Sequence, residues 1–136
     1  MVAYGFGITL ALPYEQAIER IKEALKAEGF GVLTEIDVRR TLRDKLGLET
    51  APYVILGACN PHLAHRALEL EPEIGLLLPC NVVVRAVADG SRVEIADPQA
   101  MLAVSGNPQL EQIAQEARTR LQRALAALAP LSAPSA

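Results

Sequence analysis

The sequence predicts an α+β fold, with helices packed on one side of a mostly antiparallel sheet. Segments with apolar residues at every second position alternate with segments whose apolar residues recur every three or four positions. Two β-branched runs meet at Asp89-Gly90, a dipeptide typical of tight hairpins, which require antiparallel strands. The longest segment with helical spacing follows all of the expected strands, at residues 108–128. This order of elements favours helices segregated to one face of an antiparallel sheet.

The first elements follow from their apolar spacing. Residues 4–10 alternate large apolar side chains with small ones, which predicts a half-buried strand. A helix is expected over residues 13–28, because Pro13 suits a first helical turn, the apolar residues form one stripe, and Gly29 can end the helix. Residues 30–36 then return to an extended pattern.

The middle of the chain predicts a short helix and a buried strand. Asp37 is placed to cap a helix over residues 38–46, which ends at Gly47. Residues 51–58 form a continuous apolar run, which predicts a strand covered on both of its faces.

Asn60-Pro61 and Asn107-Pro108 predict helix starts, because the asparagine can cap the helix and the proline can occupy its first position. Asp97-Pro98 predicts a turn or a short helical segment through Met101. Between them, the runs around Asp89-Gly90 predict a hairpin in which these two residues supply the positive φ of the turn.

Length and composition predict one domain over residues 1–129 and a flexible tail over residues 130–136. A formal charge of −3 and only five aromatic residues argue against a nucleic-acid-binding protein. The apolar N-terminal stretch lacks a basic leader and is broken at Pro13, so we expect neither a signal peptide nor a membrane span. Two widely spaced cysteines do not make a disulfide scaffold. We therefore expect a cytoplasmic protein with reduced thiols.

The stretch VILGACNPHLAH, residues 54–65, contains the first candidate site. If a strand ends at Cys59 and a helix starts after Asn60, the thiol lies beside the free N–H groups of the first helical turn. That position favours a thiolate, and the same corner could hold an anion. The alternative is that Cys59 is an inert, buried apolar residue, as cysteines at strand ends often are.

The second candidate feature is a possible soft-metal site. His62 and His65 lie three positions apart, and Cys80 precedes a strand much as Cys59 ends one. Cys59, His62 and Cys80 are the metal ligands that we predict, although zinc or copper usually requires three or four ligands brought together by the fold. Surface or capping roles are the alternative for the histidines. Asn81 follows Cys80 as Asn60 follows Cys59, so two thiols and two amides could line one pocket.

Two charged groups have weaker indications. Glu35 and Asp37 lie two apart on one strand and share a face, so one carboxyl could serve acid or base chemistry, although Asp37 is better explained as a helix cap. The basic residues of the predicted short helix are more simply a solvated surface than an anion site. The chain contains no phosphate-binding loop, no nucleophilic-serine motif and no zinc-protease motif.

Several short motifs together resemble the domain-of-unknown-function 302 family over about residues 3–128. They are GFGVLTEIDV, ILGACNP and LLPCNVVV, followed by ADP and a long C-terminal helix. The resemblance implies a β-α-β4-α arrangement similar to that of the TATA-box-binding protein, in a small bacterial or archaeal homodimer. It implies no activity. The positions that match the motifs are Gly29, Phe30, Gly31, Glu35, Asp37, Cys59, Asn60, Pro61, Pro79, Cys80 and Asn81.

These observations lead to one main functional hypothesis and two alternatives. We expect a homodimeric module that binds a small ligand or a soft metal, in a pocket lined by Glu35, Cys59, Asn60, His62, Cys80 and Asn81. The first alternative is a thiol-dependent enzyme that uses Cys59. The second is a purely structural interaction domain with silent cysteines. No particular cofactor is indicated.

Overall fold

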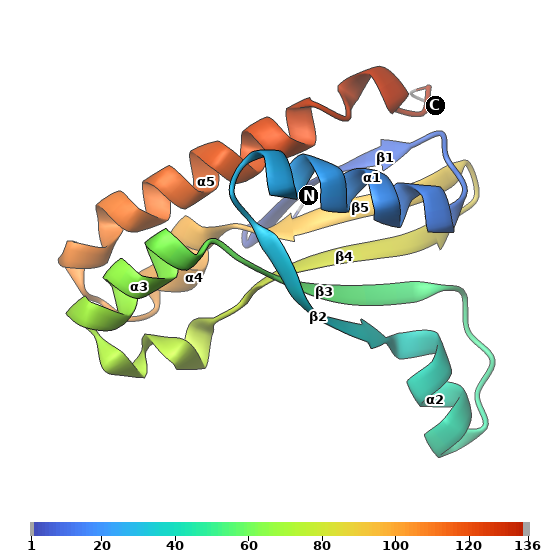
Figure 1. Cartoon of the computed structure of the whole chain (residues 1–136). Coiled ribbons are helices and arrows are strands. Elements are labelled where there is room, and N and C mark those ends of the chain that lie inside the picture. The colour runs from blue at the N-terminus through green and yellow to red at the C-terminus, as the bar shows by residue number, and fades with distance from the viewer. Residues whose placement is uncertain (1, 135–136) are drawn as a thin grey trace.

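The computed structural model describes residues 2–134 and has the predicted α+β architecture (Figure 1). Its core follows the β-α-β4-α order, with shorter helices between the strands. The elements are β1 (Gly5–Leu10), α1 (Tyr14–Ala27), β2 (Gly31–Asp37), α2 (Val38–Leu46), β3 (Tyr53–Cys59), α3 (Pro61–Leu70), η1 (Pro72–Leu77), β4 (Cys80–Val87), β5 (Gly90–Ala96), α4 (Pro98–Ala103), η2 (Pro108–Leu110), α5 (Glu111–Ala126) and η3 (Ala129–Leu131), where η marks a short 3-10 helix.

All five strands pair antiparallel, in the order β1-β5-β4-β3-β2. One face of the sheet is covered by α1 and α5, as Figure 1 shows. Alternate residues of the inner strands point to these helices, and Leu56, Val84 and Val93 are completely buried there. On the helix side, Ile21 and Leu121 are also completely buried. This layer between sheet and helices is the hydrophobic core.

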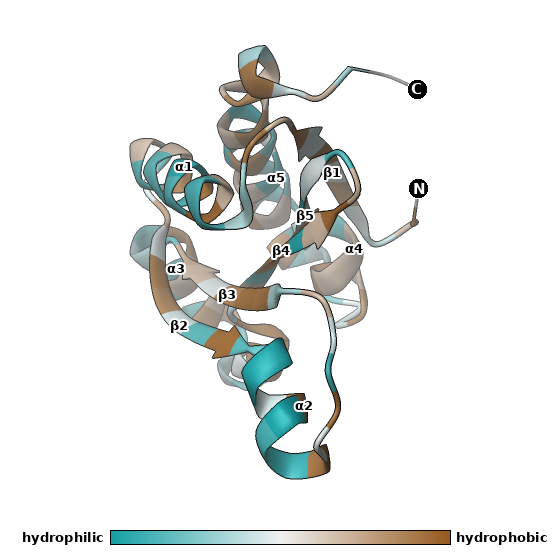
Figure 2. Cartoon of the chain, turned by 90° about the vertical axis from the view of Figure 1, so that its right-hand side faces the viewer, coloured by the Kyte–Doolittle hydropathy of each residue, from teal (hydrophilic) through white to brown (hydrophobic). Residues whose placement is uncertain are grey.

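Among the described residues, 2–134, no helix lies over the opposite face of the sheet (Figures 1 and 2). The prediction that residues 51–58 are covered on both faces is therefore wrong. In β3 only Val54, Leu56 and Ala58, which face the helices, are buried apolar side chains, whereas Tyr53 and Ile55 on the other face are partly exposed. The continuous apolar run did not indicate burial on both faces, because apolar residues of β3 also lie on the uncovered face.

The predicted helix caps are present. Asp37 accepts a hydrogen bond from the Arg40 N–H at 3.0 Å, and Gly47 ends α2 with a left-handed φ of 65°. The Asp97 and Asn107 side chains likewise accept hydrogen bonds from the N–H groups two residues further along the chain. These starts depend on contacts only two or three residues apart, so they could be predicted locally.

The predicted hairpin is also present, with its turn shifted by one residue. Val87 pairs with Gly90, so Ala88 and Asp89 form the turn, and Gly90 is already the first residue of β5. Among the residues of this hairpin only Gly90 has a positive φ, 142°, and an added Cβ there would collide with the Leu10 carbonyl oxygen. Glycine is needed at this position both for its backbone conformation and for this close approach.

The C-terminal segment contacts β1 beyond residue 129, where the domain is predicted to end. The Ala11 N–H donates to the Leu131 carbonyl, and the Ala133 N–H donates to the Thr9 carbonyl, both at 2.8 Å. A β-bridge between Leu10 and Ser132 lies between these bonds. Residues 131–133 therefore lie along the outer edge of β1, and the last two residues of the predicted tail lie outside the described part of the chain. Within residues 2–134, no helix is long and apolar enough to cross a membrane.

Candidate functional site

The first wall of the site is the corner between β3 and α3. Cys59 ends the strand and Asn60 caps the helix, with its Oδ1 accepting a hydrogen bond from the Leu63 N–H at 3.2 Å. Asn60 is only 6% exposed. An added Cβ on Gly29 would lie 2.9 Å from the Asn60 amide nitrogen, so glycine at position 29 leaves room for the cap.

The second wall is the start of β4. Cys80 pairs with Ala58 and Asn81 pairs with Gly57, which places the two Cys-Asn pairs at the same end of the sheet. The Leu78–Pro79 peptide bond is cis. An added Cβ on Gly57 would collide with the Thr34 hydroxyl and lie 2.8 Å from the Pro79 ring, so the glycine allows both to pack against β3.

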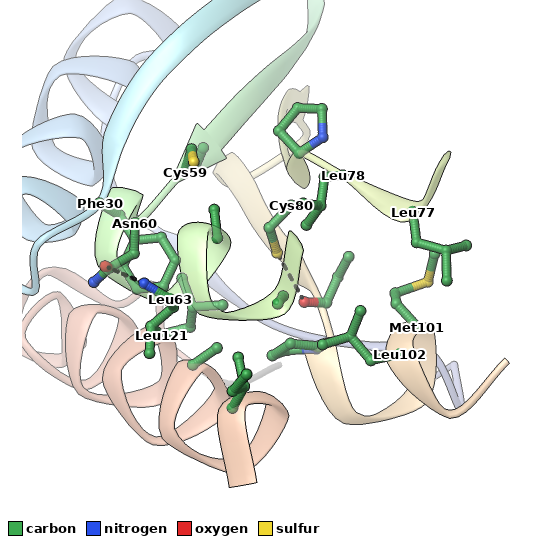
Figure 3. Close-up of a pocket in the computed structure, with 18 of the residues that line it drawn as sticks. Phe30, Cys59, Asn60, Leu63, Leu77, Leu78, Cys80, Met101, Leu102 and Leu121 are labelled. Carbon is green, nitrogen blue, oxygen red and sulfur yellow. Dashed lines mark hydrogen bonds between the residues drawn. The ribbon is translucent and has the colours of Figure 1, made fainter. Parts of the chain in front are cut away.

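These walls enclose a cavity of about 80 Å³ at the end of the sheet, between α3, η1, α4 and α5 (Figure 3). Four of the predicted site residues, Cys59, Asn60, Cys80 and Asn81, line it. The remaining lining residues are all apolar: Phe30, Ala58, Leu63, Ala64, Ala67, Leu77, Leu78, Pro79, Ala96, Pro98, Met101, Leu102, Ile113, Ala117 and Leu121.

The two thiols belong to opposite faces of the sheet. Because Cys80 is paired with the buried Ala58, it faces the helices, and strand alternation directs the next residue, Cys59, the other way. The Cys80 thiol donates a hydrogen bond to the Ala96 carbonyl at 3.4 Å (Figure 3). Both cysteines are free, and neither residue is wholly buried.

Burial opposes the Cys59 thiolate that the helix N-terminus was expected to favour, because it raises the pKa of the thiol. Burial, together with the nearby Asp97 carboxylate, raises the pKa of Cys80 to about 12. Both thiols are therefore protonated near neutral pH.

Glu35 and His62 lie away from the cavity. The Glu35 carboxylate forms an ion pair with Lys22 of α1 at 2.8 Å, because its pairing with Leu56 directs it to the helix side of the edge strand. His62 is exposed on α3 and does not line the cavity. His65 instead contacts Glu69 one turn further along α3, at 2.8 Å.

The predicted soft-metal site is not formed. Across residues 2–134, no group of three or more His, Cys, Asp or Glu side chains is arranged to hold a metal ion. Cys59 and Cys80 both line the cavity, but the rotation of α3 turns His62 to the solvent. Sequence spacing could not reveal this rotation.

The sequence interpretation missed most of the apolar wall. Phe30, Leu77, Met101 and Leu121 come from four segments far apart in the chain, and each is an ordinary apolar residue in its own segment. No local pattern marks such residues as neighbours. The only usable signal was the pair of prolines around residues 72–79, which indicates an irregular segment able to close one side of a pocket.

The comparisons with known proteins indicate the same family as the sequence motifs. The family model for the domain of unknown function DUF302 matches residues 6–128. The crystal structure of an uncharacterized conserved DUF302 protein from Bacillus stearothermophilus is similar, with 32% sequence identity and a TM-score of 0.86 over 93% of this chain and 99% of that chain. No curated protein matches the sequence. The motifs, the fold and the extent of the sequence similarity agree. The chain therefore belongs to the DUF302 family.

Proposed function

We propose that this protein is a small-ligand-binding module whose cavity takes a neutral, apolar ligand. The observation that supports this most directly is the composition of the cavity wall, in which no charged side chain takes part. A pocket of this kind binds through apolar burial, and an ionised ligand would lose its hydration there without a partner charge.

The polar groups of the wall support the same class of ligand. The Asn60 side-chain oxygen Oδ1 already accepts a hydrogen bond from the Leu63 N–H, and the Cys80 thiol already donates to the Ala96 carbonyl. Each of these two groups therefore already has a hydrogen-bond partner within the protein. Asn81 is exposed, so it is available for a polar end of the ligand that reaches the solvent.

The size of the cavity sets the size of the group that enters it. Its volume of about 80 Å³ is roughly half that of an engineered cavity of about 150 Å³ that binds benzene or xenon. Leu77 and Met101 form one side (Figure 3), and methionine is an adaptable side chain that can shift to fit a guest. The ligand therefore inserts a small apolar group or the end of an aliphatic chain.

The thiol-dependent enzyme is a weaker hypothesis. A nucleophilic cysteine needs a lowered pKa, whereas the pKa values of both thiols are raised. Neither His62 nor Glu35 lies in the cavity wall as a partner base. A dithiol reaction between Cys59 and Cys80 is also disfavoured, because the strand register directs the two side chains to opposite faces.

We also propose that the protein is a homodimer, as the family resemblance implies. The support within this chain is the uncovered face of the sheet, on which apolar side chains such as Ile36 are exposed. Homodimerisation and ligand binding involve different surfaces, so each can be tested alone.

Binding of xenon and benzene to the native protein tests the ligand hypothesis. Methyl NMR spectra recorded with each probe are expected to show shifts at Leu77, Met101 and Leu102, whose side chains line the cavity. Ala64→Leu fills the cavity from α3 and is expected to abolish these shifts. Ala126→Leu on the exposed side of α5 is the matched control and should leave them unchanged.

Two outcomes would overturn the hypothesis. One is that neither probe shifts the methyl signals of the cavity in folded wild-type protein. The other is that Ala64→Leu and Ala126→Leu reduce the shifts equally. Either result would favour a purely structural interaction domain with an unoccupied packing defect.

A further inference from the structure

One side of the cavity is built from two short segments. The ends of β3 and β4, together with the longer helices α3 and α5, form the other sides. This side consists of η1 and α4, each of which has only six residues. Helices as short as these are not stable alone and depend on contacts with the rest of the protein. The contacts of η1 and α4 therefore determine how easily this side of the cavity opens.

Leu77 of η1 and Met101 of α4 lie on this side of the cavity, as Figure 3 shows. Both residues are partly exposed, so they border the solvent as well as the cavity. Other partly exposed residues of the lining, such as Cys59 and Cys80, belong to strands whose positions are fixed by pairing within the sheet. A path for a ligand therefore widens most readily between Leu77 and Met101.

The contact between η1 and α4 is not held by hydrogen bonds. The two segments touch, but across residues 2–134 no hydrogen bond joins a residue of η1 to a residue of α4. Methionine has three rotatable bonds, so the Met101 side chain can move aside without breaking a directional contact. The polar contacts that hold α4 lie at its two ends.

The first end of α4 is held by Arg118 of α5. The Arg118 Nη1 donates a hydrogen bond to the Gln99 side chain at 2.9 Å and lies 3.2 Å from the Asp97 Oδ2. The other carboxylate oxygen of Asp97 caps α4 by accepting a hydrogen bond from the Gln99 N–H at 2.9 Å. The Asp97 side chain is only 12% exposed, which strengthens these charge-assisted contacts. We call Arg118, Asp97 and Gln99 the α4 clamp.

The second end of α4 is held to the segment before η1. The Ser105 hydroxyl donates a hydrogen bond to the Leu102 carbonyl at 2.7 Å and accepts one from the Asn107 N–H at 3.1 Å. The Asn107 side-chain amide donates to the Glu71 carboxylate at 3.2 Å, and Glu71 directly precedes η1. This end links α4 to η1, whereas the α4 clamp links it by an ion pair to α5. When the clamp is released, α4 can turn about this second end.

Another arginine of α5 forms a similar ion pair away from α4. The Arg123 guanidinium lies 2.9 Å from the Glu28 carboxylate, just after α1. Glu28 does not line the cavity, whereas Asp97 and Gln99 belong to the start of a segment that does. Both ion pairs attach α5 to a neighbouring segment. Arg123 is therefore a matched control for Arg118.

We propose that α4 is the movable side of the cavity, that a ligand enters between Leu77 and Met101, and that Arg118 is the positioning residue that holds this side closed. The inference rests on the proposed function, because it takes the cavity as the ligand site. It adds how entry to that site is controlled.

Amide hydrogen exchange, followed by NMR on the full chain without a ligand, tests the α4 clamp. The Met101 N–H, which donates to the Asp97 carbonyl at 3.0 Å, reports on α4. Arg118→Gln is expected to speed its exchange about tenfold, because the clamp loses an ion pair. The Leu56 N–H in the middle of the sheet reports on global unfolding, and its exchange should change less. Arg123→Gln should leave the Met101 rate unchanged.

Rates of benzene binding, measured by NMR, test the entry path. In Arg118→Gln, association and dissociation of benzene should both become about tenfold faster, while the affinity changes by less than about threefold. A merely structural role of Arg118 would lower the affinity or the thermal stability without this paired change in rates. Arg123→Gln should keep both rates. Arg118→Lys retains the charge and replaces Arg118→Gln if that variant does not fold.

The outcomes separate this inference from the proposed function. Absence of benzene binding to folded wild-type protein would overturn the proposed function and the entry path, while amide exchange would still decide whether Arg118 holds α4. Equal Met101 exchange in wild type and Arg118→Gln would overturn the clamp. Faster Met101 exchange with unchanged benzene rates would contradict entry between Leu77 and Met101.

Discussion

The two faces of the sheet differ in how completely this chain buries its apolar residues. On the covered face, Leu56, Val84 and Val93 are fully buried beneath α1 and α5. On the open face, Ile55 and Val83 are of the same chemical type, yet they remain partly exposed. The difference teaches that one face provides the stability of the monomer, whereas the other is available for association.

The sharpest test of this comparison is a pair of substitutions at adjacent positions of β3. Leu56→Ala leaves a cavity in the core and is expected to lower the free energy of unfolding by about 2–5 kcal/mol. Ile55→Ala should lower it by about 1 kcal/mol or less in dilute protein, because its side chain already contacts solvent. Urea unfolding at low protein concentration measures both values. Equal losses would mean that the two faces are equally important to the monomer.

A second test compares two helix caps. Asn60 is buried beside the cavity, so Asn60→Ala should cost about 1–2 kcal/mol and leave the Leu63 N–H without its partner. Asp37→Ala removes an exposed cap from α2 and should cost about 0.5–1 kcal/mol. Thermal unfolding compares the two variants. A larger effect at Asp37 would show that α2 matters more to the fold than its exposure indicates.

A third test uses pH and concerns Cys80. The pKa of its thiol rises from 9.0 to about 12 on folding, so between these values the unfolded chain loses a proton that the folded chain keeps. Unfolding free energy is therefore expected to fall with rising pH in this range, by at most about 1.4 kcal/mol per pH unit. Cys80→Ala should remove this slope, whereas Cys59→Ala should remove less of it. The same slope in wild type and Cys80→Ala would contradict the assignment.

The smallest expected effect is at Glu35. Its ion pair with Lys22 lies at the edge of the covered face, where both side chains are partly exposed. Glu35→Gln should change the free energy of unfolding by less than about 1 kcal/mol and leave ligand binding unchanged. Urea unfolding and the xenon titration measure the two quantities. A loss of xenon binding would restore Glu35 to the site.

The sequence was sufficient for features fixed by near neighbours. The Asn60 cap needs only Leu63, three residues away, and the hairpin needs only a short loop with a glycine. The family resemblance supplied the β-α-β4-α arrangement, which the local patterns do not establish alone. These features explain why the fold and one corner of the cavity could be predicted.

The rest of the site depends on register and rotation. A bulge between Val32 and Thr34 shifts the pairing of β2, and Glu35 then points to Lys22 instead of the cavity. The direction of His62 depends on how α3 packs, which its own sequence does not determine. Met101 lines the cavity because of contacts between α4 and distant elements. Such facts are properties of the whole fold.

The C-terminal segment along β1 has a consequence for aggregation. By bonding to Thr9 and Ala11, it occupies backbone groups that would otherwise be open to a strand from another molecule. At the opposite edge, the bulge in β2 interrupts the ladder that an added strand would need. With one edge partly closed and the other irregular, the molecules are hindered from joining edge to edge into fibrils.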